Sequence, residues 1–207
     1  MFIALEGMDG SGKSTQIELL RQEFERRRRP VVITREPGGT AIGEQIREIL
    51  LRPENGAMAA RTEALLYAAS RAQHVAEVIE PALAAGKIVI SDRYVASSYV
   101  YQGIARDLGL EAVEKINWFA TGGRMPDLTI FLFVSRQQAL RRKKAQKELD
   151  RLEAEPMTFH AKVDQGFRRL AESYPGTSLI LEADAAPAEV HDRIWRRLEQ
   201  ELGEERK

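Results

Sequence analysis

The stretch GMDGSGKST, from Gly7 to Thr15, has the composition and spacing of a phosphate-binding loop. Gly7, Gly12, Lys13 and Ser14 match the pattern G-x-x-x-x-G-K-[ST]. Glycines let successive backbone N–H groups turn toward phosphate oxygens, the lysine reaches the β- and γ-phosphates, and the hydroxyl ligates Mg²⁺. The stretch therefore predicts binding of a nucleoside triphosphate with magnesium. The residues predicted to form this site are Gly7, Met8, Asp9, Gly10, Ser11, Gly12, Lys13, Ser14 and Thr15.

A second apolar run ends in two charged residues, Asp92 and Arg93, within KIVISDRY. Motor-type ATPases usually have Asp-Glu at this place, where the glutamate polarises water. An arginine is better suited to binding a second phosphate. The Asn-Lys-x-Asp pattern that binds guanine in GTPases is absent from the sequence. The chain is therefore predicted to transfer a phosphoryl group to an acceptor.

Three further segments carry residues that could hold an acceptor. TREPGGT, residues 34–40, contains two glycines that allow close approach of the backbone to a ligand, although an ordinary strand-to-helix turn would look the same. EALLYAASRAQH places Tyr67 and Arg71 on one helical face, where they could stack on and hydrogen-bond a base. An amphipathic helix with a surface arginine is the alternative. DRYVASSYVYQG, residues 92–103, mixes hydroxyls, aromatic rings and an amide, which is typical of a pocket.

The composition is that of an ordinary globular protein of 207 residues, most simply a single domain. Lys+Arg 31 balances Asp+Glu 31, so no global charge favours nucleic acid or a membrane surface. The sequence contains no cysteine and no apolar run close to the roughly 18 residues that a membrane span needs. We therefore expect a cytoplasmic protein with neither nucleic acid nor membrane as partner.

Short apolar runs alternate with longer stretches of helical period, which predicts an α/β fold with a parallel sheet covered on both faces. Pro81 is expected to kink or split the helix that contains it. The predicted strands are Phe2–Glu6, Val31–Arg35, Ile88–Asp92, Leu128–Val134 and Ser178–Glu182. The predicted helices are Lys13–Arg28, Ile42–Leu51, Arg61–Ala85, Leu110–Thr121, Arg136–Lys147, Met157–Ser173 and Ala188–Leu202.

The phosphate-binding loop, TREPGGT, RTEALLYAASR, DRYVASSYVYQG, PDLTIFL and LDRLE occur in the order and spacing of the thymidylate kinase family, which the chain resembles from about Phe2 to Glu153. The resemblance implies transfer of the γ-phosphoryl group of ATP to thymidine 5′-monophosphate (dTMP), forming dTDP, with Mg²⁺. It also implies the P-loop nucleoside monophosphate kinase fold, a five-stranded parallel sheet flanked by helices. On this reading residues 1–207 form one kinase domain, with a short lid inserted at about 141–153.

The resemblance implies a role for each acceptor-side residue. Tyr67 would stack on thymine, Arg71 would bond its O4, Ser97 and Gln102 would lie near the base, and Tyr101 would crowd the sugar 2′ position. Asp92 would serve the metal together with Ser14. The residues expected to bind dTMP are Asp9, Arg35, Glu36, Pro37, Arg47, Tyr67, Arg71, Arg93, Ser97, Ser98, Tyr101 and Gln102.

The lid is expected to supply a cation, because the variable positions of the phosphate-binding loop carry none. Within RRKKAQKELDRLE we choose Arg151, so that Lys13, Arg93 and Arg151 are the predicted catalytic residues. Arg142 or Lys143 could share this role, since Lys147 replaces a glycine common in relatives. An exposed charged helix is the alternative for the whole run.

Other nucleoside monophosphate kinases and a nucleic-acid-stimulated P-loop ATPase are the competing functions. The resemblance also suggests a homodimer, without indicating its interface, and adenine contacts from the loop Ala183–Pro187. The histidines lack metal-ligand spacing and are expected on solvated helix faces, whereas the two tryptophans are expected in packing.

Overall fold

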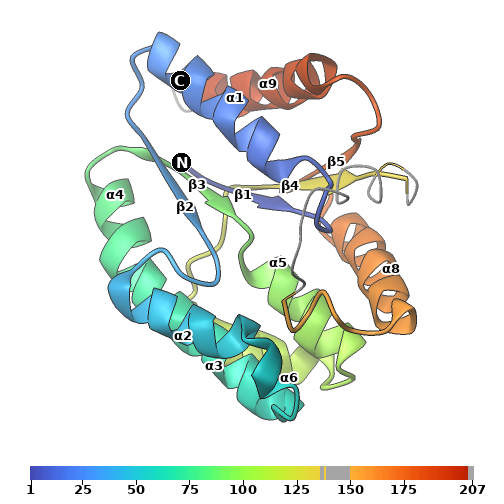
Figure 1. The fold of residues 1–207 in the computed structure, drawn as a ribbon. Helices are drawn as coiled ribbons and strands as arrows, with labels where there is room; N and C mark the ends of the chain where they lie inside the picture. The colour runs from blue at the N-terminus through green and yellow to red at the C-terminus, as the bar shows by residue number, and fades with distance from the viewer. Residues whose placement is uncertain (136–137, 139–149, 205–207) are drawn as a thin grey trace.

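The computed structural model describes residues 1–135, 138 and 150–204 (Figure 1). The predicted helix Arg136–Lys147 and the residues Arg142 and Lys143 fall almost wholly outside this part. The strands are β1 (Phe2–Glu6), β2 (Val31–Arg35), β3 (Ile88–Asp92), β4 (Leu128–Phe133) and β5 (Ser178–Glu182). The helices are α1 (Lys13–Arg26), α2 (Ala41–Leu51), η1 (Pro53–Asn55), α3 (Ala60–His74), η2 (Val75–Ile79), α4 (Glu80–Ala84), α5 (Val95–Ser98), η3 (Tyr99–Ala105), α6 (Leu110–Thr121), α8 (Met157–Ser173) and α9 (Pro187–Glu204).

The five strands form one parallel sheet in the order β2-β3-β1-β4-β5. This confirms the predicted α/β class and sheet, and the predicted strands differ from the observed ones only at the end of β4. Because all strands run the same way, their carboxyl ends meet at one edge, where ligands bind in open α/β sheets. The loops after β1, β2 and β3 all leave from this edge.

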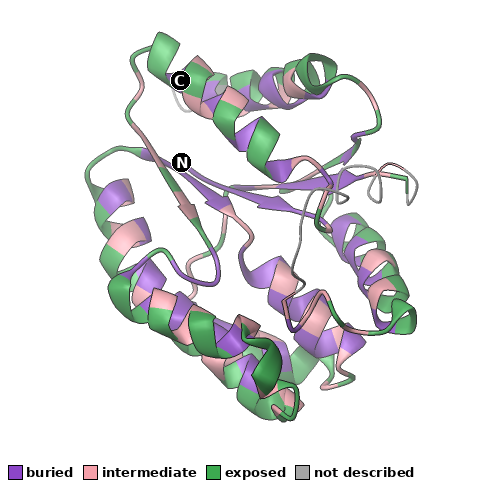
Figure 2. Ribbon diagram, viewed as in Figure 1, coloured by how far each residue is buried: buried purple, intermediate pink, exposed green. Residues whose placement is uncertain are grey.

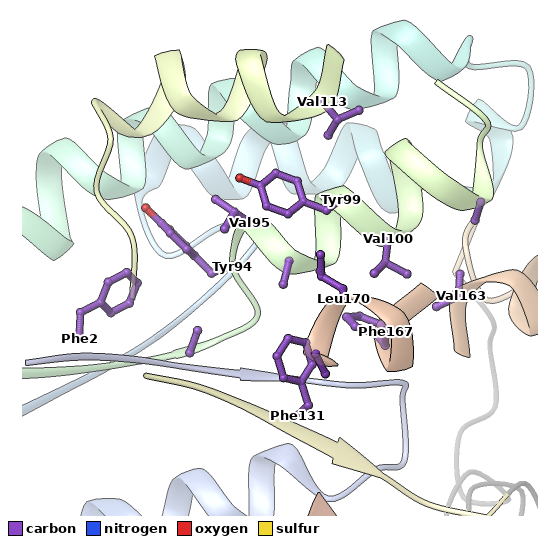
Figure 3. Packing of buried hydrophobic residues seen from close by; sticks show 14 of the residues in the cluster. Phe2, Tyr94, Val95, Tyr99, Val100, Val113, Phe131, Val163, Phe167 and Leu170 are labelled. Carbon is purple, nitrogen blue, oxygen red and sulfur yellow. The ribbon is translucent and has the colours of Figure 1, made fainter. Parts of the chain in front are cut away.

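Alternating side chains of the buried strands pack against different helices. In β1, Ile3 and Leu5 belong to the core that α1 and α9 cover, whereas Phe2 and Ala4 face a second core formed with α5, η3 and α8. Figure 1 shows these helices on opposite faces of the sheet, and Figure 2 shows that the central strands are buried. Figure 3 shows aromatic rings of the second core, including those of Tyr94, Phe131 and Phe167, which bury much of its apolar surface.

One helical segment was not predicted, and one predicted helix is interrupted near its proline. The segment Val95–Ala105 is helical, as α5 followed by the π-helix η3, although its aromatic and β-branched residues have low helix propensity. Burial of Tyr99 and Val100 in the second core compensates for this. Pro81 splits its helix as predicted, since the π-helix η2 separates α3 from α4. No helix in the described part of the chain is long and apolar enough to cross a membrane.

Candidate functional site

The phosphate-binding loop runs from the end of β1 to the start of α1. Gly7 has φ 138°, and a Cβ there would lie 2.4 Å from the backbone oxygen of Leu132, so only glycine fits. Helix α1 begins at Lys13, and its N-cap Gly12 has no side chain that could bond the first amide groups. The helix N-terminus is therefore open to an anion, as the sequence predicts.

Lys13 lies beneath this loop, with its ammonium group bonded to loop carbonyls. Its Nζ donates to the backbone oxygens of Gly7 at 3.1 Å and Met8 at 3.2 Å, and lies 4.0 Å from a carboxylate oxygen of Asp9. Burial lowers the pKa of Lys13, and the charge of Arg93 lowers it further, while nearby carboxylates oppose the shift. The loop thus fixes a cation where the phosphates of a nucleotide would lie.

A cavity of about 650 Å³ adjoins this loop at the carboxyl edge of the sheet, and we call it the main cavity. It brings together the loop and all twelve predicted acceptor residues, although these residues come from segments that are far apart in the sequence. The predicted residues that line it are Asp9, Gly10, Gly12, Lys13, Ser14, Thr15, Arg35, Glu36, Pro37, Arg47, Tyr67, Arg71, Asp92, Arg93, Ser97, Ser98, Tyr101 and Gln102. Gly7, Met8 and Ser11 do not line it.

Arg71 lies on the inner face of α3, with only 1% of its surface exposed. Its Nε donates to Glu36 at 2.7 Å, and its Nη1 donates to Ser98 at 3.0 Å and to Asn117. Its Nη2 donates to the backbone oxygen of Tyr94 at 3.2 Å. The alternative of a surface arginine is therefore wrong, and the guanidinium is held rigidly at the wall of the cavity.

Glu36 joins Arg71 to a histidine that we expected on a solvated face. His74 is fully buried, with Nδ1 2.9 Å from a carboxylate oxygen of Glu36 and Nε2 2.6 Å from the hydroxyl of Thr34. The expectation for His74 was wrong because its partners are set by the packing of α3 against the end of β2. Another histidine, His160, lines the main cavity.

Arg93 occupies the turn after β3 in a left-handed conformation, with φ 71°. Its guanidinium donates to Asp9 at 2.8 Å and to Ser97 at 3.2 Å, and its Cζ lies 5.6 Å from the ring centroid of Tyr101. Burial alone would lower the pKa of Arg93, but Tyr101, Asp9 and other acidic groups hold it well above its ordinary value. Burial also raises the pKa of Tyr101 to about 12, so this ring is neutral.

Glu6 holds this turn in place and was not identified from the sequence. The fully buried carboxylate accepts from the backbone N–H of Tyr94 at 2.8 Å and from the N–H and hydroxyl of Ser97 at 3.2 and 2.6 Å. Asn117, which bonds Arg71 from α6, was missed as well. An acidic residue that ends a buried strand was the available signal for Glu6, whereas nothing local marked Asn117.

Arg35 and Arg47 approach the other end of the main cavity from β2 and α2. Arg35 is exposed and donates to both carboxylate oxygens of Glu44, at 2.9 and 2.8 Å. Arg47 donates to the backbone oxygen of Pro37 at 2.9 Å. Arg35, Arg47 and Arg93 are three of the four arginines that line this cavity in the described part of the chain, and their charges suit a dianionic phosphate.

Asp92 and Ser14 are suited to holding a magnesium ion. The Oδ1 atom of Asp92 is buried and has no hydrogen-bond partner in the described part of the chain, and Ser14 is exposed in the same cavity. Oxygen ligands of this kind suit Mg²⁺. The described residues contain no cluster of three or more His, Cys, Asp or Glu side chains that could hold a metal alone. Mg²⁺ would therefore need phosphate oxygens and water as further ligands.

Arg151 is the one predicted catalytic residue that the structure does not bring into the main cavity. Its Nη1 lies 2.7 Å from Glu63, its Nε donates to the backbone oxygen of Leu50 at 2.7 Å, and it is 5% exposed. These contacts attach the end of the predicted lid to α2 and α3. Its neighbours, which the sequence did not single out, line the cavity instead: Asp150, Leu152 and Glu153, together with Leu51 from α2.

A second cavity, of about 260 Å³, shares Gly12 and Thr15 with the lining of the main cavity. It is formed by the start of α1 and by the loop that leads into α9, which includes the predicted adenine loop. Its lining residues are Ser11, Gly12, Thr15, Gln16, Ala183, Ala185, Pro187 and Val190. Both cavities therefore adjoin the N-terminus of α1.

The tryptophans have different environments. Trp195 is buried against Phe24, with ring centroids 5.1 Å apart, as expected for a packing residue. Trp118 is 64% exposed on α6, so the same expectation was wrong there.

Comparisons with known proteins agree with this geometry. The family model "Thymidylate kinase" matches residues 5–194. The chain is 48% identical to the thymidylate kinase of Lactobacillus helveticus, covering 98% of this chain and 97% of that protein. It is 44% identical to that of Caldanaerobacter subterraneus, covering 97% and 96%. The crystal structure of thymidylate kinase from Ehrlichia chaffeensis superposes with a TM-score of 0.79 at 28% identity, covering 96% of this chain and 98% of that one.

Proposed function

Because the chain belongs to the thymidylate kinase family, it transfers the γ-phosphoryl group of ATP to dTMP, and we propose that the main cavity holds the two nucleotides end to end. One observation carries this proposal: a single cavity is lined both by the phosphate-binding loop and by the buried groups of α3 and η3. The donor phosphates would lie at the loop, and the acceptor would lie between the loop and Arg71.

In this proposal each wall of the main cavity binds one part of dTMP. Tyr67 stacks on thymine, Arg71 bonds its O4, and Ser97, Ser98 and Gln102 complete the base site. The sugar lies between Asp9, which accepts from the 3′-hydroxyl, and Tyr101, which crowds the 2′ position. The acceptor phosphate is bound by Arg35, Arg47 and Arg93, with Glu36 and Pro37 shaping the loop beside it.

The reaction needs cations more than it needs a general base. The second pKa of a phosphate monoester is about 6, so the attacking oxygen is already largely deprotonated near pH 7. The obstacle is repulsion between two polyanions, about 1 kcal/mol for each close charge pair in water and more in a drier site. Lys13 and Arg93 offset this repulsion and stabilise charge on the transferring group.

Magnesium completes the site in this proposal. Ser14 and Asp92 would hold it beside the donor phosphates, and the metal would neutralise charge on the β- and γ-oxygens. The unpartnered, buried Oδ1 of Asp92 supports this assignment.

The remaining cation would come from the lid, inserted at about 141–153 in a single kinase domain. The contacts of Arg151 support a role in anchoring the lid, and the other candidates, Arg142 and Lys143, lie outside the described residues. These contacts favour the anchoring role of Arg151 over the catalytic role that the sequence predicts.

The second cavity is our candidate for the adenine site, because it adjoins the phosphate-binding loop and none of the residues expected to bind dTMP lines it. The predicted loop Ala183–Pro187 supplies three of its lining residues, Ala183, Ala185 and Pro187. A cytoplasmic location belongs to the same proposal.

We further propose that two copies form a homodimer through the surface of α2, α3 and α6. These helices pack side by side, and several of their large apolar side chains are exposed. Trp118 is 64% exposed and Phe119 90% exposed, which is costly unless another surface covers them. The residues that define this surface, called here the α2–α3–α6 surface, are Ile42, Ile49, Leu65, Leu110, Trp118 and Phe119.

A panel of nucleoside monophosphates tests the function. With ATP and Mg²⁺, ADP release should be fastest with dTMP, and removal of Mg²⁺ by EDTA should abolish it. Equal or faster turnover of GMP or CMP would exclude the proposed substrate. ATPase activity that rises with added DNA and ignores dTMP would favour a nucleic-acid-stimulated ATPase instead.

A further inference from the structure

Glu63 is a buried carboxylate that the proposed reaction does not use. It lies in the first turn of α3 with no exposed surface. It accepts from Gln102 Nε2 at 2.9 Å and from Arg106 at 3.3 and 3.1 Å, and lies 2.7 Å from Arg151 Nη1. We call these four residues the Glu63 cluster.

The surroundings keep Glu63 ionised. Burial alone would raise the pKa of its carboxyl group, but the hydrogen bonds from Gln102 and Arg106, the charge of Arg106 and the bond from Arg151 hold that pKa below its ordinary value. An ionised carboxylate has no hydrogen to donate. Every group that binds Glu63 must therefore turn a donor toward it.

This requirement fixes the orientation of the Gln102 amide. Only the NH₂ end of the amide can bond Glu63, so the carbonyl oxygen must point elsewhere. Gln102 is 1% exposed and lines the main cavity, and its carbonyl oxygen has no hydrogen-bond partner among the described residues. At Gln102 the cavity wall thus presents the carbonyl oxygen, a hydrogen-bond acceptor. The amide cannot rotate to present its NH₂ group instead.

Arg71 presents a hydrogen-bond donor to the same cavity, where Gln102 presents an acceptor. Its bonds to Glu36, Ser98, Asn117 and Tyr94 leave one hydrogen of Nη2 without a partner in the described part of the chain. A base held here meets a fixed donor and a fixed acceptor. The Watson–Crick edge of a uracil-type base matches them, with O4 as acceptor and N3–H as donor. Cytosine has the reverse pattern, with an amine at C4 and an unprotonated N3.

We propose that Glu63 is a positioning residue for base selection, which acts by holding the carbonyl oxygen of Gln102 toward N3–H of a uracil-type base. The inference rests on the acceptor site proposed above. Loss of the charge at position 63 would allow the Gln102 amide to rotate and to offer its NH₂ group to N3 of cytosine. The selectivity for a uracil-type base over cytosine should then fall, while the binding of ATP should not change.

The test compares dUMP with dCMP, because these substrates differ only in the edge that Gln102 and Arg71 would face. We expect Glu63→Gln to reduce the ratio of kcat/KM for dUMP over dCMP by about tenfold or more, the size of effect that one mispaired hydrogen bond produces. The KM for ATP should stay within about twofold. The matched control is Glu155→Gln, which removes the other carboxylate bound to Arg106 without touching Gln102. It should leave the dUMP to dCMP ratio unchanged.

The double variant Glu63→Gln, Gln102→Glu exchanges the two groups, so that the amide is at position 63 and the carboxylate is at position 102. The carboxylate would then accept from the new amide and would still offer an oxygen to the base, so the preference for dUMP should return. This variant also carries the test if Glu63→Gln alone does not fold. A double variant that prefers dCMP, a folded Glu63→Gln with an unchanged ratio, or a proportional loss for both substrates would overturn the inference. Wild-type turnover of dTMP is measured alongside, so that a failure of the proposed function is recognised separately.

Discussion

At the scale of single residues, the proposed acceptor site depends on charged groups that are buried and held by several hydrogen bonds within the protein. Arg71 and Glu36 are both less than 5% exposed, and each bonds the other and further partners. A guanidinium held in this way loses little conformational entropy when it binds a base. Removal of the Arg71 side chain should therefore weaken the binding of dTMP rather than the binding of ATP.

We expect Arg71→Ala to raise the KM for dTMP by about 10- to 100-fold, because a charge-assisted bond is lost and Glu36 is left with a poorer set of partners. The KM for ATP should change less than about threefold. Steady-state kinetics with each substrate varied in turn measures both values. Arg21→Ala on the exposed face of α1, where Arg21 pairs with Glu18 and Glu25, is the control. Equal losses for both nucleotides would mean that the base site is elsewhere.

At the scale of elements, the end of the predicted lid is attached to the body of the protein by the side chain of Arg151. Its guanidinium reaches Glu63 on α3 and the C-terminal carbonyl of Leu50 on α2, and its backbone N–H bonds Leu51 at 3.0 Å. Removal of one partner from a buried ion pair is strongly destabilising, since it leaves the other charge uncompensated.

Arg151→Ala should therefore lower the free energy of unfolding by about 2–4 kcal/mol, somewhat less than for an isolated pair because Arg106 still bonds Glu63. Urea unfolding measures this change, and Arg151→Lys should lower the free energy of unfolding by less than Arg151→Ala does. The catalytic role predicted from the sequence gives a different result: kcat would fall by orders of magnitude while stability stayed unchanged. The two outcomes separate an anchor from a catalytic cation.

The elements themselves could be predicted well from the sequence. The boundaries of β1, β2, β3 and β5 follow from short apolar runs that end in polar residues, and the phosphate-binding loop follows from glycine and lysine spacing. The helix Val95–Ala105 could not be predicted, because packing overrides the low propensity of its residues. The partners of Arg151 and His74 were missed for a related reason: they come from distant parts of the chain and leave no local pattern.

At the scale of the whole molecule, the α2–α3–α6 surface is the feature that the folded chain leaves uncovered. Phe119→Asp places a charge at the most exposed of its side chains, at 90% exposure. We expect light scattering after gel filtration to give the mass of a dimer for the wild type and of a monomer for this variant. Tyr174→Asp, a change at an aromatic residue that is 46% exposed after α8, should leave the dimer intact. A monomeric wild type would exclude the interface.

The left-handed backbone at Arg93 has a consequence for how this position can evolve. Such a conformation costs a residue other than glycine roughly 1 kcal/mol, so glycine at position 93 would relieve the backbone strain of the turn. Glycine, however, would leave Asp9 facing the incoming phosphates with no positive neighbour from β3. The backbone at this position thus favours glycine, whereas the hydrogen bonds to Asp9 and Ser97 require the arginine side chain.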